Sequence, residues 1–269
     1  MKILKLGQML GGSNAPSGAG FENLYSLAFS ASDYVTMGDA DVFTINNSGA
    51  DRGFSFSAWI KPDSRRKSII TKYQPAPPPP AVGYAEWVVK VGRNGELEFI
   101  VYGDNSTGIR QQLSTDKDYG SFIDLTDGNW HHIAGTFNLA DASTSIKLYV
   151  DGSQFVDGTG ADYSSAGTWS ASVNTIADFE MSQSAGNGFI GYMDEVALFD
   201  NSLHPLAIAA IYNGGTPTDI SGMDYLLGWW RNGDTAGTGA YPTIVDYSTN
   251  SNSGTMTNMA SGDIVTDVP

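Results

Sequence analysis

The stretch "LTDGNWHHIAGTF", residues 125 to 137, decides the fold. Its first half is rich in turn-forming Asp, Gly and Asn, and its second half is typical of a β-strand. It also contains His131 and His132, two of the three histidines in the chain. Because neighbouring strand residues point to opposite faces, these imidazoles are not expected to bind one metal ion or to form an acid/base pair. We predict structural roles for both.

The segments around this stretch repeat a pattern of strand, turn and strand. "FSFSAWIKP" (54–62) places Phe54, Phe56, Ala58 and Ile60 on one face and Ser55, Ser57, Trp59 and Lys61 on the other. Two hairpins are predicted, turning at Asn94-Gly95 and at Asp151-Gly152. "LHPLAIAAIYNGG" (203–215) predicts a short helix that stops at Asn213-Gly214. Many short strands separated by turns indicate an antiparallel sandwich or jelly roll.

Composition and charge exclude several classes of function. The chain has 269 residues, with 29 Asp and Glu against 14 Lys and Arg, and its net charge of −15 repels phosphate backbones and anionic membranes. Nucleic acid is therefore not an expected partner. The absence of cysteine excludes disulfides and thiol catalysis. No apolar segment approaches the length needed for membrane insertion.

The chain divides into three predicted parts. Residues 1–22 form an extended N-terminal arm, because "GGSNAPSGAG" is rich in Gly and Ser and follows a short basic segment with Lys2 and Lys5. This arm either docks onto a partner or is a disordered terminus. Residues 23–215 form the main domain, within which "QPAPPPPAVG" (74–83) is expected to be an extended polyproline loop. Residues 216–269 complete the sandwich or contact a neighbouring subunit.

Several motifs resemble one known family. They are "YSLAFSASDYVTMGDADVF", "FSFSAWIKP", "DGNWHHIAGTF", "IKLYVDG", "GFIGYMDEVALFDNSL" and "IAAIYNGG". Together they resemble the laminin-G-like, concanavalin A-like jelly-roll family, in the form found in bacterial surface proteins and phage virion proteins. The resemblance implies an all-β, antiparallel jelly-roll β-sandwich. One departure is that Ser30 and Ala31 stand where the family usually has Asp and Gly.

The resemblance also implies a calcium site. Calcium-binding members of the family point to Asp33, in the first strand motif, and to Asp194, in "GYMDEV". Ca²⁺ prefers clustered carboxylate and carbonyl oxygens, which an acidic, loop-rich chain supplies. The alternative is that both carboxylates accept hydrogen bonds from backbone amides at strand ends. Ser30 replaces the family's other early acid and weakens the case for calcium.

Sugar binding would require an exposed aromatic ring with polar groups around it. Trp59, on the serine face, and Trp169, in "SSAGTWSAS", are the predicted ligand-binding residues, although aromatic side chains are more often buried. Glu96 and Glu98 share a strand face, but they follow a tight turn and are expected to be exposed to solvent. No glycosidase-type Glu-x-Asp-x-Glu run occurs, so we predict that the protein is not an enzyme and has no catalytic residues.

These observations favour a non-enzymatic virion surface protein, such as a phage head decoration, head fibre or tail adhesin. The interpretation rests on the resemblance, on the Gly-rich arm and on the lack of an export signal in "MKILKLGQMLGG". The expected partners are other virion proteins, contacted through the arm or the C-terminal segment, and cell-surface glycans. A homo-oligomer is expected. The alternative is a soluble carbohydrate-binding module, and a third reading is a glycoside hydrolase or lyase.

Overall fold

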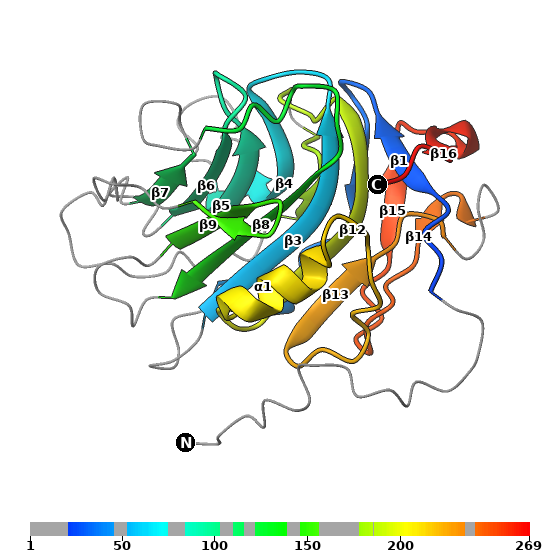
Figure 1. Cartoon of the computed structure of the whole chain (residues 1–269). Helices are drawn as coiled ribbons and strands as arrows, with labels where there is room; N and C mark the ends of the chain where they lie inside the picture. The colour runs from blue at the N-terminus through cyan, green and yellow to red at the C-terminus, as the bar shows by residue number, and fades with distance from the viewer. Residues whose placement is uncertain are drawn as a thin grey trace.

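The computed structural model describes nine ranges of the chain: 21–45, 53–74, 84–102, 110–115, 122–138, 146–155, 178–184, 186–234 and 240–269. Within them the chain forms two antiparallel sheets that face each other as two layers (Figure 1). The predicted antiparallel sandwich is confirmed. The Pro-rich segment and most of the N-terminal arm lie outside the described residues.

The first sheet contains eight of the described strands. In spatial order they are β10 (Ser153–Gln154), β9 (Ile146–Val150), β8 (His131–Asn138), β3 (Gly53–Pro62), β12 (Gly191–Phe199), β1 (Ser26–Phe29) and β16 (Ile264–Val265), with β13 (Leu226–Trp230) also paired to β12. Residues 131–137 of the stretch "LTDGNWHHIAGTF" therefore lie in β8, which pairs with β3 and β9 near the middle of this sheet.

The second sheet also contains eight described strands. Their order is β14 (Thr243–Ile244), β15 (Gly254–Thr257), β2 (Tyr34–Thr36), β11 (Phe179–Met181), β4 (Lys67–Gln74), β5 (Tyr84–Val91), β6 (Leu97–Tyr102) and β7 (Arg110–Ser114). Residues 216–269 thus add β13 and β16 to the first sheet and β14 and β15 to the second. Both additions lie beside the strands that open the domain, because β16 pairs with β1 and β15 pairs with β2.

The core lies between the inner faces of the two sheets. Phe54, Phe56, Ala58 and Ile60 are all buried there, as the alternation of β3 predicted. Aromatic rings from the two sheets meet across this space: the Phe54 and Trp87 centroids lie 5.2 Å apart, and those of Phe56 and Phe99 lie 5.1 Å apart. These aromatic contacts stabilise the packing of one sheet on the other.

Turn chemistry follows the sequence closely. Asp151 and Gly152 have φ angles of 50° and 72°, so the hairpin between β9 and β10 uses the left-handed region at both central residues. The predicted helix is α1 (Pro205–Tyr212), and it ends where Asn213 adopts φ 48° and ψ 40°. In the described part of the chain, no helix is long and apolar enough to cross a membrane.

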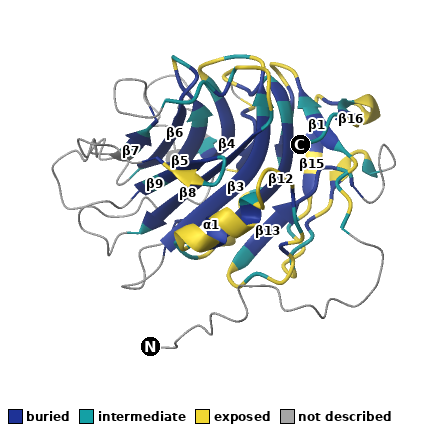
Figure 2. Ribbon diagram, in the orientation of Figure 1, coloured by how far each residue is buried: buried dark blue, intermediate teal, exposed yellow. Residues whose placement is uncertain are grey.

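The outer face of the first sheet is partly covered, which the alternating pattern of β3 does not indicate. α1 lies across this face, with its own outer side exposed (Figures 1 and 2). Ser57 and Trp59 are buried there, and Ser55 is buried beneath the segment that precedes the helix. Both faces of β3 are therefore covered, and its polar face lies beneath α1 and the segment that precedes the helix.

Candidate functional site

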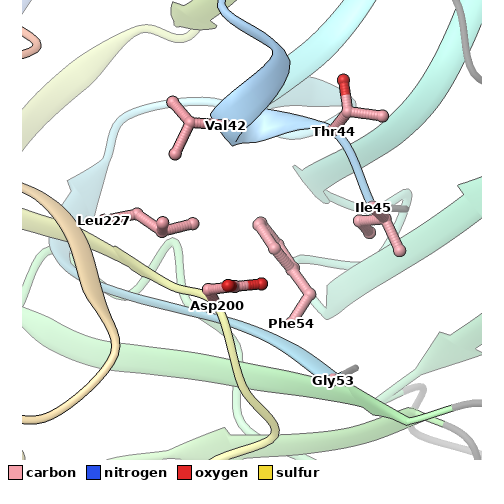
Figure 3. A pocket seen from close by; sticks show the side chains of 7 residues that line it. All are labelled: Val42, Thr44, Ile45, Gly53, Phe54, Asp200 and Leu227. Atoms are coloured by element: carbon pink, nitrogen blue, oxygen red, sulfur yellow. The ribbon is translucent and has the colours of Figure 1, made fainter. Parts of the chain in front are cut away.

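A pocket lies at one end of the sandwich, where the two sheets meet (Figure 3). It is lined by Val42, Thr44, Ile45, Gly53, Phe54, Asp200 and Leu227. One wall is the segment 39–45, which contains the short 3₁₀ helix η2 (Asp41–Phe43). The opposite wall comes from the start of β3, the residue after β12 and the start of β13. We call this the end pocket.

The wall that carries Asp200 is fixed by close contacts between β3 and the segment after β12. The Ser55 hydroxyl donates to the Asn201 carbonyl (2.6 Å) and accepts from the Leu203 amide (2.9 Å). Gly53 is needed at this point, because a Cβ atom there would lie 2.2 Å from the Ser202 nitrogen. The Asp200 amide donates to the Tyr225 carbonyl (2.9 Å), which joins this wall to the segment before β13.

The lining of the end pocket combines apolar walls with two oxygen-bearing side chains. Val42, Ile45, Phe54 and Leu227 supply the apolar surface, and Val42 is 37% exposed. Asp200 supplies the polar group of the lower wall, and Figure 3 shows it between Leu227 and Phe54. The lining therefore offers both an apolar surface and a carboxylate to a ligand.

The two predicted sugar-binding tryptophans do not line the end pocket. Trp59 is only 4% exposed, and its ring packs against Tyr212 (5.8 Å between centroids) and His132 (5.3 Å). It borders a separate small pocket beneath α1 and the segment that follows it, together with Glu195 and Trp229. The prediction for Trp169 falls outside the described residues.

The predicted calcium ligands belong to different surroundings. Asp33 is buried in the turn between β1 and β2, where its Oδ2 accepts the Ser30 amide at 2.7 Å. Asp194 lies fully buried in β12, and its Oδ1 accepts the Glu195 amide at 2.8 Å. The described ranges contain no group of three or more His, Asp or Glu side chains that could hold a metal ion. Calcium binding by Asp33 and Asp194 therefore stays a prediction.

A buried ionic cluster surrounds Arg231 at the end of β13. Arg231 pairs with Glu195 (3.2 Å) and with Asp234 (2.5 Å), while the other Glu195 oxygen accepts the Trp229 indole N–H at 2.6 Å. A register shift in β12 accompanies this arrangement, and Glu195 within it has φ 48°. The bulge turns the Glu195 carboxylate toward Arg231.

The same cluster fastens the beginning of the domain to its end. Asp234 Oδ1 accepts the amides of Leu24 and Tyr25, each at 2.7 Å. The Arg231 guanidinium donates to the Glu22 carbonyl and lies 4.3 Å from the centre of the Phe21 ring. Residues 21 and 22, which the sequence placed in the arm, are therefore packed against the sandwich.

Burial controls the acidity of the three carboxyl groups near Arg231. Burial raises the pKa of Glu195 to about 7, against the opposing effects of Arg231 and Trp229. Burial, with repulsion from Glu195 and Asp234, raises the pKa of Asp194 well above its usual range. Burial also raises the pKa of Asp234, although its backbone hydrogen bonds and Arg231 act in the opposite direction. One cation therefore does not compensate three buried acids.

The two adjacent histidines make separate contacts, as strand alternation predicts. The ring nitrogens of His131 lie 3.0 Å from Asp151 and 3.2 Å from Asp127. Burial alone would lower the pKa of His131, but these two carboxylates outweigh it and raise the pKa. His132 is fully buried, lies 2.9 Å from the Ser57 hydroxyl, and has its pKa lowered by burial to about 4. Each imidazole ring therefore contacts a different set of side chains.

The expectation that Glu96 and Glu98 are solvent-exposed is wrong. Both are buried: Glu96 accepts the backbone amides of Arg93 and Asn94, and Glu98 pairs with Lys90 at 2.9 Å. The tight turn folds back over its own carboxylate, so the turn buries Glu96 instead of exposing it. Both carboxylates therefore make contacts within the hairpin of β5 and β6.

Sequence reasoning missed the residues of the end pocket. Val42 and Asp200 lie in motifs that carried the family resemblance, "GDADVF" and "ALFDNSL", where they indicate only fold. Leu227, in β13, lies 27 residues after Asp200, so spacing along the chain gives no signal that they meet. The pocket arises from sheet pairing.

Comparisons with known proteins come from sequence and from structure. The family model of the concanavalin A-like lectin/glucanases superfamily matches residues 29–209. No curated protein matches the chain significantly. A candidate carbohydrate-binding protein from Bacteroides ovatus ATCC 8483 has a similar structure, with a TM-score of 0.56 and 16% identity over 93% of this chain and 62% of that one. The chain therefore spans less than two thirds of that protein.

A second solved structure is similar at a lower level. It is the heptameric SAP-like pentraxin from Limulus polyphemus, with a TM-score of 0.39 and 13% identity over 70% of this chain and 86% of the pentraxin chain. The binding domain of Paraclostridial Mosquitocidal Protein 1 gives a TM-score of 0.40 at 13% identity over 71% of this chain and 51% of that one. At these identities, structural likeness concerns the fold alone.

Proposed function

The chain belongs to the concanavalin A-like lectin/glucanases superfamily, and from that premise we propose that it binds carbohydrate without hydrolysing it. The single observation that carries the proposal is the lining of the end pocket, with apolar side chains on both walls and the Asp200 carboxylate beside them. A sugar ring has an apolar C–H face and a hydroxylated edge, so it matches both parts. The Bacteroides ovatus protein of similar fold, described as carbohydrate-binding, also supports this reading.

The charge of the pocket narrows the ligand class. The carboxylate of Asp200 would accept hydrogen bonds from hydroxyl or ammonium groups, while it and the net charge of −15 repel carboxylates. We propose neutral or amino sugars as ligands, in preference to uronic or sialic acids.

Binding is favoured over hydrolysis by the number of carboxyl groups. Canonical glycosidases place two carboxyl groups on either side of the scissile bond, about 5–9.5 Å apart. Among the described residues that line the end pocket, Asp200 is the one carboxylate. A lone carboxylate can orient a sugar but cannot supply both the acid and the base or nucleophile.

Glycan binding can be tested with matched surface variants. The first measurement is binding of the unaltered protein to an array that contains neutral, amino and acidic glycans. Val42→Glu, which adds a charge to the pocket, should abolish binding. Val245→Glu is the control, because Val245 has similar exposure (43% against 37%) and does not line the pocket. Equal binding by both variants, or hydrolysis of the bound glycan, would contradict the proposal.

We also propose that the protein works on the surface of a phage-like particle. This rests on the resemblance of its motifs to virion proteins and on its Gly-rich arm. Residues 216–269 supply strands to both sheets, which favours the N-terminal arm as the anchor. Removing residues 1–20 should abolish attachment to purified particles while leaving glycan binding unchanged. Full attachment without the arm would contradict this assignment.

A further inference from the structure

Lys72 is a fully buried lysine in β4. Its ammonium lies 2.8 Å from Asp39 Oδ1 and 3.0 Å from Glu86 Oε1, and the Glu86 side chain is itself almost fully buried. Replacing such a buried ion pair by apolar residues of similar volume is often neutral or stabilising. Stability alone is therefore a weak reason for a lysine at this position.

Strand pairing explains why this lysine points into the sandwich. Lys72 stands opposite Trp87 on β5 and opposite Phe179 on β11, and directly opposed residues share a face. Both rings belong to the aromatic core, 5.5 Å apart. A register shift between Lys72 and Tyr73 then brings Glu86, the residue before Trp87, beside the ammonium.

The second sheet holds the wall 39–45 of the end pocket at three points. Asp39 pairs with Lys72, the Thr44 hydroxyl donates to Glu86 (3.3 Å), and the Phe43 carbonyl accepts the Trp87 indole N–H (3.0 Å). The opposite wall of the pocket belongs to the first sheet. The width of the pocket therefore depends on how the second sheet places this wall.

We infer that Lys72 is a positioning residue for the end pocket: by pairing with Asp39 and Glu86 it fixes the wall that carries Val42, Thr44 and Ile45. The inference rests on the proposed function, since it explains how the sugar site is kept open at a defined width. Lys72 does not line the pocket and acts through the wall. This positioning role also explains why a charged side chain occupies a core position where packing does not require one.

The test uses Asp39, because its side chain is 22% exposed and can lose its charge without leaving an unpaired group in the core. In Asp39→Asn, the full-length protein should bind the methyl glycoside of a neutral or an amino hexose about tenfold more weakly, the loss expected for one hydrogen bond to a charged group. Asp39→Glu, which keeps the charge, should restore most of this affinity.

Hydrogen exchange separates positioning from general loss of stability. The Phe43 and Thr44 amides donate to Ala40 and Asp41 within the wall, so their exchange reports on the wall alone. In Asp39→Asn these two amides should exchange about tenfold faster, while the β3 amides of Phe56 and Ile60 keep their rates. Unchanged exchange in the wall would overturn the inference.

The two proposals fail in different ways. If the unaltered protein binds the glycosides and Asp39→Asn binds them equally well, the positioning role of Lys72 is wrong and the proposed function stands. If the unaltered protein binds no glycoside, the proposed function is wrong, and with it the link between Lys72 and sugar affinity. Weaker binding together with faster exchange confined to the wall supports the inference.

Discussion

The molecule contains two buried ionic clusters, and they differ in how charge is balanced. Around Lys72, one ammonium faces Glu86, which is buried, and Asp39, which reaches solvent. Around Arg231, one guanidinium faces Glu195 and Asp234 beside the fully buried Asp194. Water can stabilise the first cluster through Asp39, whose side chain is 22% exposed, whereas no side chain of the second cluster is more than 10% exposed.

The comparison teaches that the surroundings of a buried cation decide what its cluster does. The Lys72 cluster pairs with the segment that forms one wall of the end pocket. The Arg231 cluster joins residues 21–25 to the end of β13, and its carboxyl groups have raised pKa values.

Replacing the cation of the more crowded cluster should have the largest effect. Arg231→Met leaves Glu195 and Asp234 without their cation and removes the contact with Phe21, so the free energy of unfolding should fall by about 3–5 kcal/mol. Urea denaturation measures this loss. The control is Arg65→Met, which breaks an exposed pair with Asp124 and should cost less than about 1 kcal/mol. Similar losses of unfolding free energy in both variants would contradict the prediction that the buried Arg231 cluster contributes more to stability than an exposed ion pair.

Replacing the cation of the other cluster should cost less. Lys72→Met leaves one fully buried carboxylate, Glu86, and should lower the free energy of unfolding by about 3 kcal/mol. The double variant Lys72→Met/Glu86→Gln removes that stranded charge and should recover at least half of the loss, which urea denaturation can also show. A loss larger than that of Arg231→Met would reverse the comparison.

The Arg231 cluster should also make stability depend on pH. The pKa of Glu195 is raised from 4.5 to about 7 in the folded protein, so its contribution is complete below pH 4.5 and is lost as the pH rises through 7. Glu195→Gln should remove this dependence: relative to the variant, the unaltered protein should lose stability between pH 5 and pH 8 by urea denaturation. Burial would raise the pKa of Asp124, but bonds from Thr126 and Arg65 lower it, so Asp124→Asn should differ from the unaltered protein by a constant amount over this range. Parallel curves for Glu195→Gln would contradict the prediction.

The smallest effect is expected outside both clusters, at Asp33. Asp33→Ala removes the hydrogen bond that Asp33 accepts from the Ser30 amide and should cost about 1 kcal/mol. Thermal unfolding in calcium and in a chelator should show the same loss. A loss confined to the calcium condition would instead favour the calcium site predicted from the sequence.

The sequence by itself determined the fold and most of the local structure. Alternation in "FSFSAWIKP" identified the core face of β3, and the Asp151-Gly152 and Asn213-Gly214 pairs located a hairpin turn and a helix end. Alternation also separated the two histidines. These features depend on residues close together in the chain, where backbone geometry leaves few choices.

Tertiary contacts determined which side chains are buried and which residues line the end pocket. The polar face of β3 predicted an exposed Trp59, but α1 covers this face and buries the ring, because the helix follows β12, the strand beside β3. Glu96 was buried by its own turn. The end pocket joins Val42, Asp200 and Leu227, which are far apart in the sequence. Lys72 points inward because of its register with Trp87, and register depends on long-range pairing that no local pattern contains.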